Sequence, residues 1–407
     1  MRIGIDFSAK KENGGVYQYC LSFLDSLKKV VGNEYVIFVS SPDFPSEYER
    51  YFEVVNLTAA AADPSGNSKI KKSLIERGYR ILLALRLFVV IDFAYRFIIF
   101  KSILKAVDDQ KIDLMIFLSG AAFGAYLKIP YIAPIHDLAH RKYPEFPEVS
   151  QNGRWQSRER YYRKLCQTAK AILVDSEIGK EDVLHYYQVD PSKVVPLPFL
   201  PPNYLLDSLS AEEARLLIKE YQLPEKFLFY PAQFWPHKNH LRLVRAIKLL
   251  KDSGLIINIV FSGSKQVEWG EFEKVESYVK ANNLENQVWY LGYVSNQVMS
   301  ALYKTAQALI MPTFFGPTNI PVLEAWKMSC PVIYSNIKGC REQLGEAGLL
   351  IDPKEVSDIA EKMKLIWLDQ GLRVDLINKG KRRLSLWTFD DFSARVQKLL
   401  NDIKLNN

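Results

Sequence analysis

The chain has 407 residues, of which 48% are hydrophobic and 24% charged, and its formal net charge is +7. This length exceeds what one ordinary core supports, so we expect two domains, and the composition excludes a disordered or low-complexity protein. The four cysteines are scattered, with no CxxC pair and no histidine at ligand spacing. We therefore expect free thiols, a reducing compartment and no metal site.

The N-terminal sequence MRIGIDFSAK reads as a strand and lacks the apolar core of a signal peptide. A cytoplasmic protein is therefore expected. The modest basic charge suits polyanionic ligands or an anionic membrane surface. No dense Lys/Arg run with interleaved aromatic residues indicates nucleic-acid binding, so none is expected.

Short apolar strands alternate with helical stretches along the chain. Five strands are expected in the first half, at 2–7, 34–40, 114–118, 131–137 and 171–176. Helices are expected from about Gly14 to Lys29 and over 180–187. A second series of strands is expected at 226–233, 257–263, 288–294, 308–313 and 330–335. This alternation is typical of parallel sheets covered by helices on both faces.

A proline-rich stretch, with four prolines between 196 and 202, separates the two series. We predict an α/β protein with two Rossmann-like domains, 1–200 and 201–387, whose parallel sheets face a cleft. In open α/β sheets ligands bind at the carboxyl ends of strands, so residues directly after strands are the candidates for chemistry.

The stretch 69–105 is very apolar, but Arg86, Asp92 and Arg96 interrupt it. No part of it reaches the ~20 uncharged residues of a membrane-spanning helix. Basic residues far outnumber acidic ones. Two interpretations stay open: a mostly buried helical pair, or a surface that lies on the inner leaflet of a membrane.

Two motifs in the first half follow expected strands. NGGVYQY places Gly14 and Gly15 at the start of a helix, where backbone N–H groups favour anions, although a plain tight turn explains the pair equally well. It is not GxGxxG, which disfavours an NAD-dependent dehydrogenase. In PIHDLAHRKYPE, His136 and Asp137 end an apolar strand, so His136 is either a cleft residue or a structural one. His140 could equally be a surface residue.

The loop YPAQFWPHKNH follows the first strand of the second series. Its Lys238 stands just before a helix, where a cation opposes the helix dipole unless an anionic ligand is present. A solvated loop lysine is the alternative.

The stretch FFGPTNIPVLEAW, 314–326, starts another helix. Pro321 suits a first helical turn, and the residues before it expose backbone N–H groups. Glu324 is favourable near a helix start for electrostatic reasons alone, but a carboxylate also binds the vicinal hydroxyls of a sugar or ribose. A helix start that holds phosphate beside such a carboxylate suits a nucleotide-sugar.

Together these motifs resemble the retaining glycosyltransferases of the GT-B fold, in particular family 4 (glycosyl transferases group 1). The resemblance covers nearly the whole chain: YPAQFWPHKNH resembles the diphosphate loop, FSGS a second glycine loop, LGYVSNQVMSALYKTA the base-binding segment and PTFFGPTNIPVLEA the paired-glutamate block. VDSEIGKEDVLHYY carries the family pattern before the hinge. The last helix, about 388–404, is expected to pack back onto the N-terminal domain.

The resemblance implies roles for individual residues. His136, Lys238 and Glu324 would be catalytic. The donor would contact Gln233, Gly263, Ser264, Tyr293, Val294, Gly316, Pro317, Thr318, Asn319 and Ile320. The acceptor side would include Gly14, Gly15 and Asp137.

Two positions depart from the family pattern. Gln233 stands where an arginine is usual in the diphosphate loop, and Gly316 replaces the first glutamate of the pair. A phosphate-binding charge and a sugar-binding carboxylate are thereby lost, and Thr318 and Asn319 could compensate.

The resemblance implies a retaining glycosyltransferase that moves a sugar from a nucleotide-sugar to a saccharide or lipid-linked saccharide in bacterial cell-surface polysaccharide assembly. It implies no cofactor and no metal. The enzyme would be cytoplasmic, with possible peripheral contact through 69–105. The main alternative is a non-catalytic nucleotide-sugar-binding subunit, and another GT-B enzyme, such as an epimerase or a phosphorylase, is disfavoured.

Overall fold

The computed structural model describes residues 1–57, 78, 82, 87–121, 123–265 and 268–405. The chain divides into two compact units. Unit 1 consists of Met1–Pro144, Val149–Pro198 and Phe389–Asn407, and unit 2 consists of Glu145–Glu148 and Phe199–Thr388. One point of division thus falls after Pro198. The short segment Glu145–Glu148 clusters with unit 2, although its place in the sequence puts it in the first predicted domain.

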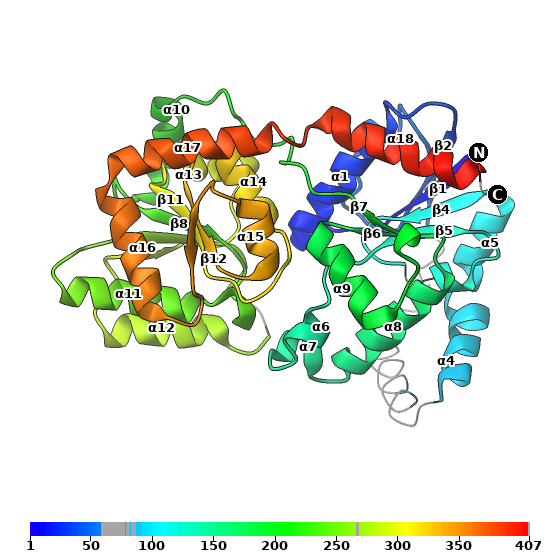
Figure 1. The fold of residues 1–407 in the computed structure, drawn as a ribbon, viewed down its shortest axis with the longest axis horizontal. Helices are drawn as coiled ribbons and strands as arrows, with labels where there is room; N and C mark the ends of the chain where they lie inside the picture. The colour runs from blue at the N-terminus through cyan, green and yellow to red at the C-terminus, as the bar shows by residue number, and fades with distance from the viewer. Residues whose placement is uncertain (58–77, 79–81, 83–86, 122, 266–267, 406–407) are drawn as a thin grey trace. The chain divides into compact units, whose positions relative to one another are not determined.

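Unit 1 is built on a seven-stranded sheet in which every pairing is parallel, in the order β3-β2-β1-β4-β5-β6-β7. The strands are β1 Arg2–Phe7, β2 Glu34–Val39, β3 Glu53–Asn56, β4 Leu114–Phe117, β5 Tyr131–Pro134, β6 Ala171–Val174 and β7 Val194–Pro196. The α-helices within it are α1 Gly15–Leu27, α4 Phe88–Ala94, α5 Lys101–Asp109, α6 Ala139–Lys142, α8 Arg154–Thr168, α9 Glu177–Tyr187 and α18 Phe389–Leu405. Helices lie on both faces of the sheet, so its central strands are apolar and buried (Figure 1).

Unit 2 repeats this plan with a six-stranded parallel sheet in the order β10-β9-β8-β11-β12-β13. Its strands are β8 Leu228–Pro231, β9 Ile259–Ser262, β10 Val288–Tyr290, β11 Ala308–Met311, β12 Val332–Ser335 and β13 Leu349–Ile351. Its α-helices are α10 Ala211–Leu217, α11 His240–Asp252, α12 Glu271–Ala281, α13 Asn296–Thr305, α14 Ile320–Lys327, α15 Lys338–Leu344, α16 Val356–Leu368 and α17 Gln370–Leu384. One more helix, α7 Pro147–Ser150, has residues in both units, because the division falls between Glu148 and Val149.

Every predicted strand is present, and the prediction of two parallel α/β sheets is confirmed. The sequence missed β3, β7 and β13, each of which lies at the edge of its sheet. β7 corrects the prediction that the proline-rich stretch is only a hinge, because Val194–Pro196 pairs with β6. Proline is tolerated on an edge strand, where one side needs no ladder hydrogen bond.

The last helix, α18, packs against α1 within unit 1 (Figure 1). Its Phe392 is fully buried, and the Phe392 ring centroid lies 6.5 Å from that of Tyr19 and 6.2 Å from that of Phe23. At the rim, the Lys29 ammonium lies 2.6 Å from the Asp390 carboxylate. The end of the chain is therefore part of the N-terminal fold.

Of the stretch 69–105, only residues 78, 82 and 87–105 lie within the described residues. The continuous part, 87–105, is helical: α4, a π-helical turn Tyr95–Ile99 and the start of α5. Of the two open interpretations, the mostly buried pair does not describe this part well, because Phe93, Phe97 and Ile98 are 60%, 53% and 72% exposed. Ile91, in contrast, is 2% exposed.

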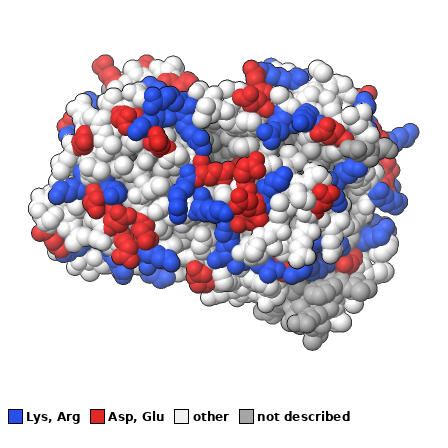
Figure 2. Space-filling model, in the orientation of Figure 1, with Lys and Arg blue, Asp and Glu red and all other residues white. Residues whose placement is uncertain are grey.

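Within the described residues, no helix combines the length and apolarity needed to cross a membrane. On the described surface visible in Figure 2, basic and acidic side chains are intermixed. The charges on that face are thus interspersed and not gathered in one large field of a single sign.

Candidate functional site

Each sheet has one point where the strand order reverses: between β1 and β4 in unit 1, and between β8 and β11 in unit 2. At such a switch point the loops after the two strands run to opposite faces and leave a crevice, where open α/β sheets bind ligands. The Gly14–Gly15 motif follows β1, and the Lys238 loop and the 314–326 stretch follow β8 and β11. The topology therefore places these predicted motifs at the two switch points.

The loops after β8 and β11 are joined directly. The Phe314 N–H donates to the His237 carbonyl oxygen (2.9 Å), and the Asn239 side-chain amide donates to the carbonyl oxygens of Pro312 and Pro353 (3.0 and 2.7 Å). Asn239 has a left-handed backbone with φ of 64°, which asparagine tolerates. Lys238 ends the 3-10 turn just before α11, so its position beside the helix start is fixed by the loop.

Glu148 is an unpredicted partner of this loop. Its carboxylate, 6% exposed, accepts hydrogen bonds from the His237 backbone N–H (3.0 Å) and from His237 Nδ1–H (2.7 Å). The imidazole also stacks on the Phe315 ring at 3.8 Å. Although burial acts in the opposite direction, the hydrogen bonds and charge of His237 hold the pKa of Glu148 below its usual value. His237, the residue before Lys238, is thus held in place by the ionised Glu148 carboxylate.

Gln233, Gly263, Ser264 and Tyr293 form one cluster at the ends of β8, β9 and β10. The Gln233 side-chain amide donates to the Tyr293 hydroxyl (2.8 Å), and the Phe234 N–H donates to the Ser264 carbonyl oxygen (3.3 Å). Gly263 has a φ of +124°, and a Cβ there would lie 2.8 Å from the carbonyl carbon of Ala232. Only glycine fits this close approach. Tyr293 is 64% exposed, whereas Val294 packs against the core of unit 2.

The turn Gly316 to Ile320 forms a second cluster, held against α15. The Asn319 N–H donates to Gln343 Oε1 and Gln343 Nε2–H donates back to the Asn319 carbonyl oxygen, both at 2.9 Å. Pro317 packs so closely on Gly339 that a Cβ at Gly339 would lie 2.5 Å from Pro317 backbone atoms. The N–H of Asn319 is therefore engaged within the fold. A ligand at this helix start would have to use other groups, such as Thr318 or the Ile320 N–H.

Glu324 is buried, and its carboxylate accepts hydrogen bonds from the Tyr204 and Tyr303 hydroxyls, each at 2.6 Å. Burial raises the pKa of Glu324 despite these two donors. The helix-dipole explanation is not supported, because Glu324 is the fifth residue of α14 and lies beyond the first turn. A sugar diol would have to share the carboxylate with the two tyrosines or displace one of them.

On the unit 1 side, Gly14 has a φ of +53° and precedes Gly15, the first residue of α1. His136 follows β5, and its Nε2 lies 3.3 Å from the Leu118 carbonyl oxygen, to which it can donate. Burial lowers the pKa of His136, so the neutral imidazole is favoured at pH 7. Asp137 pairs with Arg158 and accepts the Ala139 N–H (2.8 Å), so it shapes the turn after His136.

Two further findings concern histidine and cysteine. His140 is fully buried and contacts Glu159 at 3.2 Å, which corrects the idea of a surface residue. All four cysteines are free and buried. In the part of the chain that the structure describes, no three His, Cys, Asp or Glu side chains come together as metal ligands.

Two family profiles match the chain, one for each unit. The profile described as "Glycosyltransferase Family 4" matches residues 13–198, and "Glycosyl transferases group 1" matches residues 216–383. Together they span most of both units. The chain belongs to family 4 of the GT-B glycosyltransferases.

Individual relatives agree with this family. The O-antigen chain mannosyltransferase B of Escherichia coli is 25% identical over 252 residues, which are 61% of this chain and 65% of that relative. Part of that relative therefore lies outside the match. The O-antigen chain mannosyltransferase RfbU of Salmonella typhimurium (strain LT2) is 23% identical over 403 residues, which are 97% of this chain and 98% of that protein.

Among solved structures, Anabaena Alr3699/HepE in complex with UDP-glucose superposes with a TM-score of 0.71 at 14% identity. The match covers 99% of this chain and 100% of that chain. At this identity the likeness establishes the GT-B fold alone.

Proposed function

We propose that this family 4 glycosyltransferase is a retaining enzyme that moves a sugar from a nucleotide-sugar to a saccharide or lipid-linked saccharide acceptor in bacterial cell-surface polysaccharide biosynthesis. The observation that carries the proposal is the joined pair of loops at the unit 2 switch point, with Lys238 at a helix start. The relatives named as O-antigen mannosyltransferases support the pathway and make a mannosyl donor the first candidate.

In the proposed mechanism, Lys238 neutralises the diphosphate that leaves the sugar. A charge-assisted contact gains strength as negative charge develops on the leaving group, so it lowers the barrier to bond cleavage. Glu148 contributes by holding His237, and thereby the loop, in one arrangement. Glu324 would accept hydrogen bonds from donor hydroxyls, and His136 would contact the donor sugar or its phosphate. We expect no metal to be needed.

Compared with the family pattern, this chain lacks the first glutamate of the pair and the arginine of the diphosphate loop. Gln233 bonds to Tyr293 and Trp235, so it stabilises the loops and supplies no charge. Lys238 is then the cation on which the proposed diphosphate site depends. This makes the site sensitive to a single substitution.

The decisive experiment is a donor screen with UDP-, GDP- and dTDP-sugars, including mannosyl donors, in buffer that contains EDTA. Thermal shift reports binding, and release of nucleoside diphosphate with an acceptor reports transfer. An NMR measurement of the anomeric configuration of the product tests the retaining mode. Binding without release for every donor and acceptor pair would instead support the non-catalytic subunit.

We further propose a cytoplasmic location, at the inner face of the membrane. The exposed apolar residues of α4 and the following π-helical turn support this proposal. Fractionation of cells that produce the protein tests it directly.

A further inference from the structure

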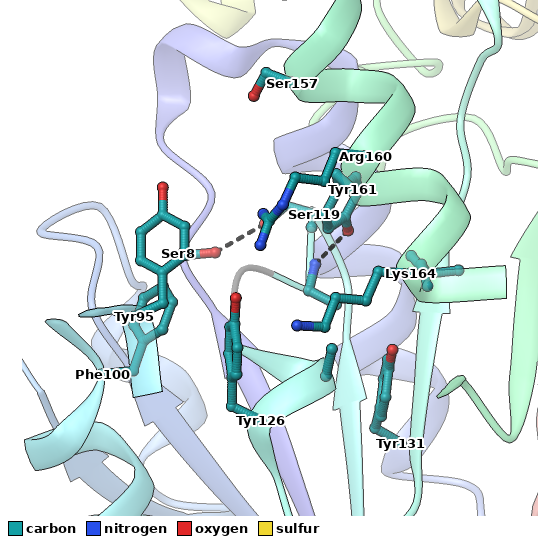
Figure 3. Close-up of a pocket in the computed structure, with 14 residues that line it drawn as sticks. Ser8, Tyr95, Phe100, Ser119, Tyr126, Tyr131, Ser157, Arg160, Tyr161 and Lys164 are labelled. Atoms are coloured by element: carbon teal, nitrogen blue, oxygen red, sulfur yellow. Dashed lines mark hydrogen bonds between the residues drawn. The ribbon is translucent and has the colours of Figure 1, made fainter. Parts of the chain in front are cut away.

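The switch point of unit 1 contains a cavity of about 420 Å³ whose described lining includes none of the predicted site residues. At its base, Ser8 follows β1 and Ser119 follows β4, and their hydroxyls share a hydrogen bond of 2.8 Å. Figure 3 shows these serines facing side chains that project from α8. The cavity therefore occupies the position where an open α/β sheet binds its ligand.

Two cations from α8 enter this cavity. Arg160 and Lys164 are one helical turn apart, and their side chains are only 16% and 26% exposed. Both contact the Asp92 carboxylate, which also accepts the Tyr126 hydroxyl (2.7 Å). Burial opposes ionisation of Asp92, but the hydrogen bonds from Lys164 and Tyr126 and the charge of Arg160 lower its pKa. One carboxylate against these two cations leaves a local net positive charge, which is suited to a phosphate. The Ser8 and Tyr126 hydroxyls already donate to Asp6 (2.8 Å) and Asp92, so the two cations are the groups on which anion binding would depend.

The same cavity borders the exposed apolar surface of unit 1. Tyr95 and Phe100 line the cavity and stack on each other at 5.3 Å. Phe93, Phe97 and Ile98, from the same helical segment, point to solvent, and the Phe93 and Phe97 rings lie 4.9 Å apart. Exposed Arg96 and Lys101 flank these apolar side chains. An apolar surface with a basic fringe suits the boundary of a lipid layer.

We propose that this cavity binds the phosphate or diphosphate of a lipid-linked acceptor, with the lipid chain on the exposed face formed by Phe93, Phe97 and Ile98. The identification of the bound lipid as the acceptor rests on the proposed function. A neutral saccharide has no charge to offer two partly buried cations. A lipid phosphate needs cations for its charged headgroup and an apolar surface for its chain, and here the two occur on adjoining surfaces.

The test measures binding and needs neither donor nor transfer. Neutral phosphatidylcholine vesicles carry either a long-chain prenyl diphosphate or phosphatidylglycerol of equal total charge, and co-sedimentation gives the apparent affinity. The pocket variant is Arg160→Gln/Lys164→Gln, and the matched control is Arg163→Gln/Lys128→Gln, which removes two exposed charges of unit 1. Adding Asp92→Asn to the pocket variant removes the carboxylate left without its cations and guards against misfolding.

We expect the prenyl diphosphate to raise affinity more than tenfold over phosphatidylglycerol, and we expect this gain to vanish in both pocket variants but not in the control. Equal binding to the two vesicle types, or a gain that survives in the folded pocket variants, would overturn the proposal. Full competition by inorganic diphosphate at equal concentration would mean a site for free anions and would also overturn it. Phe93→Ser/Phe97→Ser should weaken binding of the long-chain lipid but not of a short, water-soluble prenyl diphosphate. Equal losses of affinity for both ligands would show that the apolar surface does not hold the lipid chain.

If lipid binding behaves as expected but no donor supports transfer, the proposed function fails while the lipid site stands. If transfer occurs and the pocket variants leave the acceptor KM unchanged, the lipid site fails while the function stands.

Discussion

The two switch points share one strand topology but have different surroundings. In unit 2 the loops are joined by backbone hydrogen bonds, and Gly263 leaves no room for a side chain beside Ala232. In unit 1 the corresponding strand ends border a cavity of about 420 Å³ with partly buried charges. We therefore expect the proposed donor site to be prearranged for a ligand of fixed shape, and the proposed acceptor site to admit varied groups around a charged anchor. Substitutions in unit 2 should therefore change nucleotide affinity, and substitutions in unit 1 should change turnover or acceptor binding.

The largest effect is expected for Lys238→Ala. Loss of a charge-assisted contact to diphosphate costs about 1.5–3 kcal/mol, so affinity for the nucleoside diphosphate should fall roughly 10- to 100-fold, and transfer should nearly disappear. Titration calorimetry and product release measure the two quantities. Lys248→Ala, on α11 and paired with Asp252, is the matched control. Unchanged nucleotide affinity would remove Lys238 from the site.

Glu324→Gln should lose most transfer activity. Glutamine keeps the volume but offers a single acceptor oxygen to Tyr204, Tyr303 and any donor hydroxyl. Because the raised pKa of Glu324 shows that the ionised carboxylate is costly to bury, stability should change little. Glu271→Gln, a substitution of another buried carboxylate of unit 2, is the control for stability. A fully active Glu324→Gln enzyme would show that the assignment of this residue is wrong.

His136→Ala should lower turnover roughly tenfold or more while nucleotide affinity stays nearly constant, as expected of a side chain in unit 1 that acts on the reacting group. Steady-state kinetics and calorimetry separate these quantities. His185→Ala, on the exposed face of α9, is the control. If the His136 variant unfolds under the same conditions, the structural interpretation of this histidine is correct.

Gly316→Glu should not raise transfer, although it restores the family's first glutamate. Gly316 has a φ of +108°, and a Cβ there would lie 3.0 Å from the Asn319 side-chain amide nitrogen. Both features strain any side chain, at a cost of about 1–3 kcal/mol. Thermal unfolding and kinetics of Gly316→Glu and Gly316→Ala together separate backbone strain from the added carboxylate. Higher activity of Gly316→Glu would mean that the missing glutamate is a simple defect.

The smallest effect on transfer is expected for Asp6→Asn, whose readout is the pH dependence of folding. Burial raises the pKa of Asp6 to about 7, while the Ser8 hydroxyl donates to it at 2.8 Å. The folded state then binds more protons than the unfolded state between the usual aspartate pKa and about 7, so stability falls as pH rises through this window. Urea unfolding at several pH values should show that this fall is smaller in Asp6→Asn. Parallel profiles for the two proteins would contradict the assignment.

The sequence by itself determined the fold class, the order of the central strands along the chain and the family motifs. Central strands such as β4 and β11 are continuous apolar runs because helices cover both faces of a parallel sheet, and this pattern is visible without a structure. Gly14 was also recognisable, since a tight backbone turn after a strand favours glycine, and Gly263 was recognised through the family resemblance of FSGS. The edge strands β3, β7 and β13 were missed because a short strand with one unpaired side leaves only a weak apolar signal.

Only the tertiary structure decided the partners of the motif residues. Glu148, Tyr204 and Gln343 lie 89, 120 and 24 positions from the residues that they hold, and none of them belongs to a local pattern. The cavity of unit 1 was equally hidden, since its walls come from the loops after β1 and β4, from α8 and from the segment around Tyr95. Local sequence records backbone conformation and periodic burial, whereas hydrogen-bond partners and cavities depend on which distant segments the sheet order brings together.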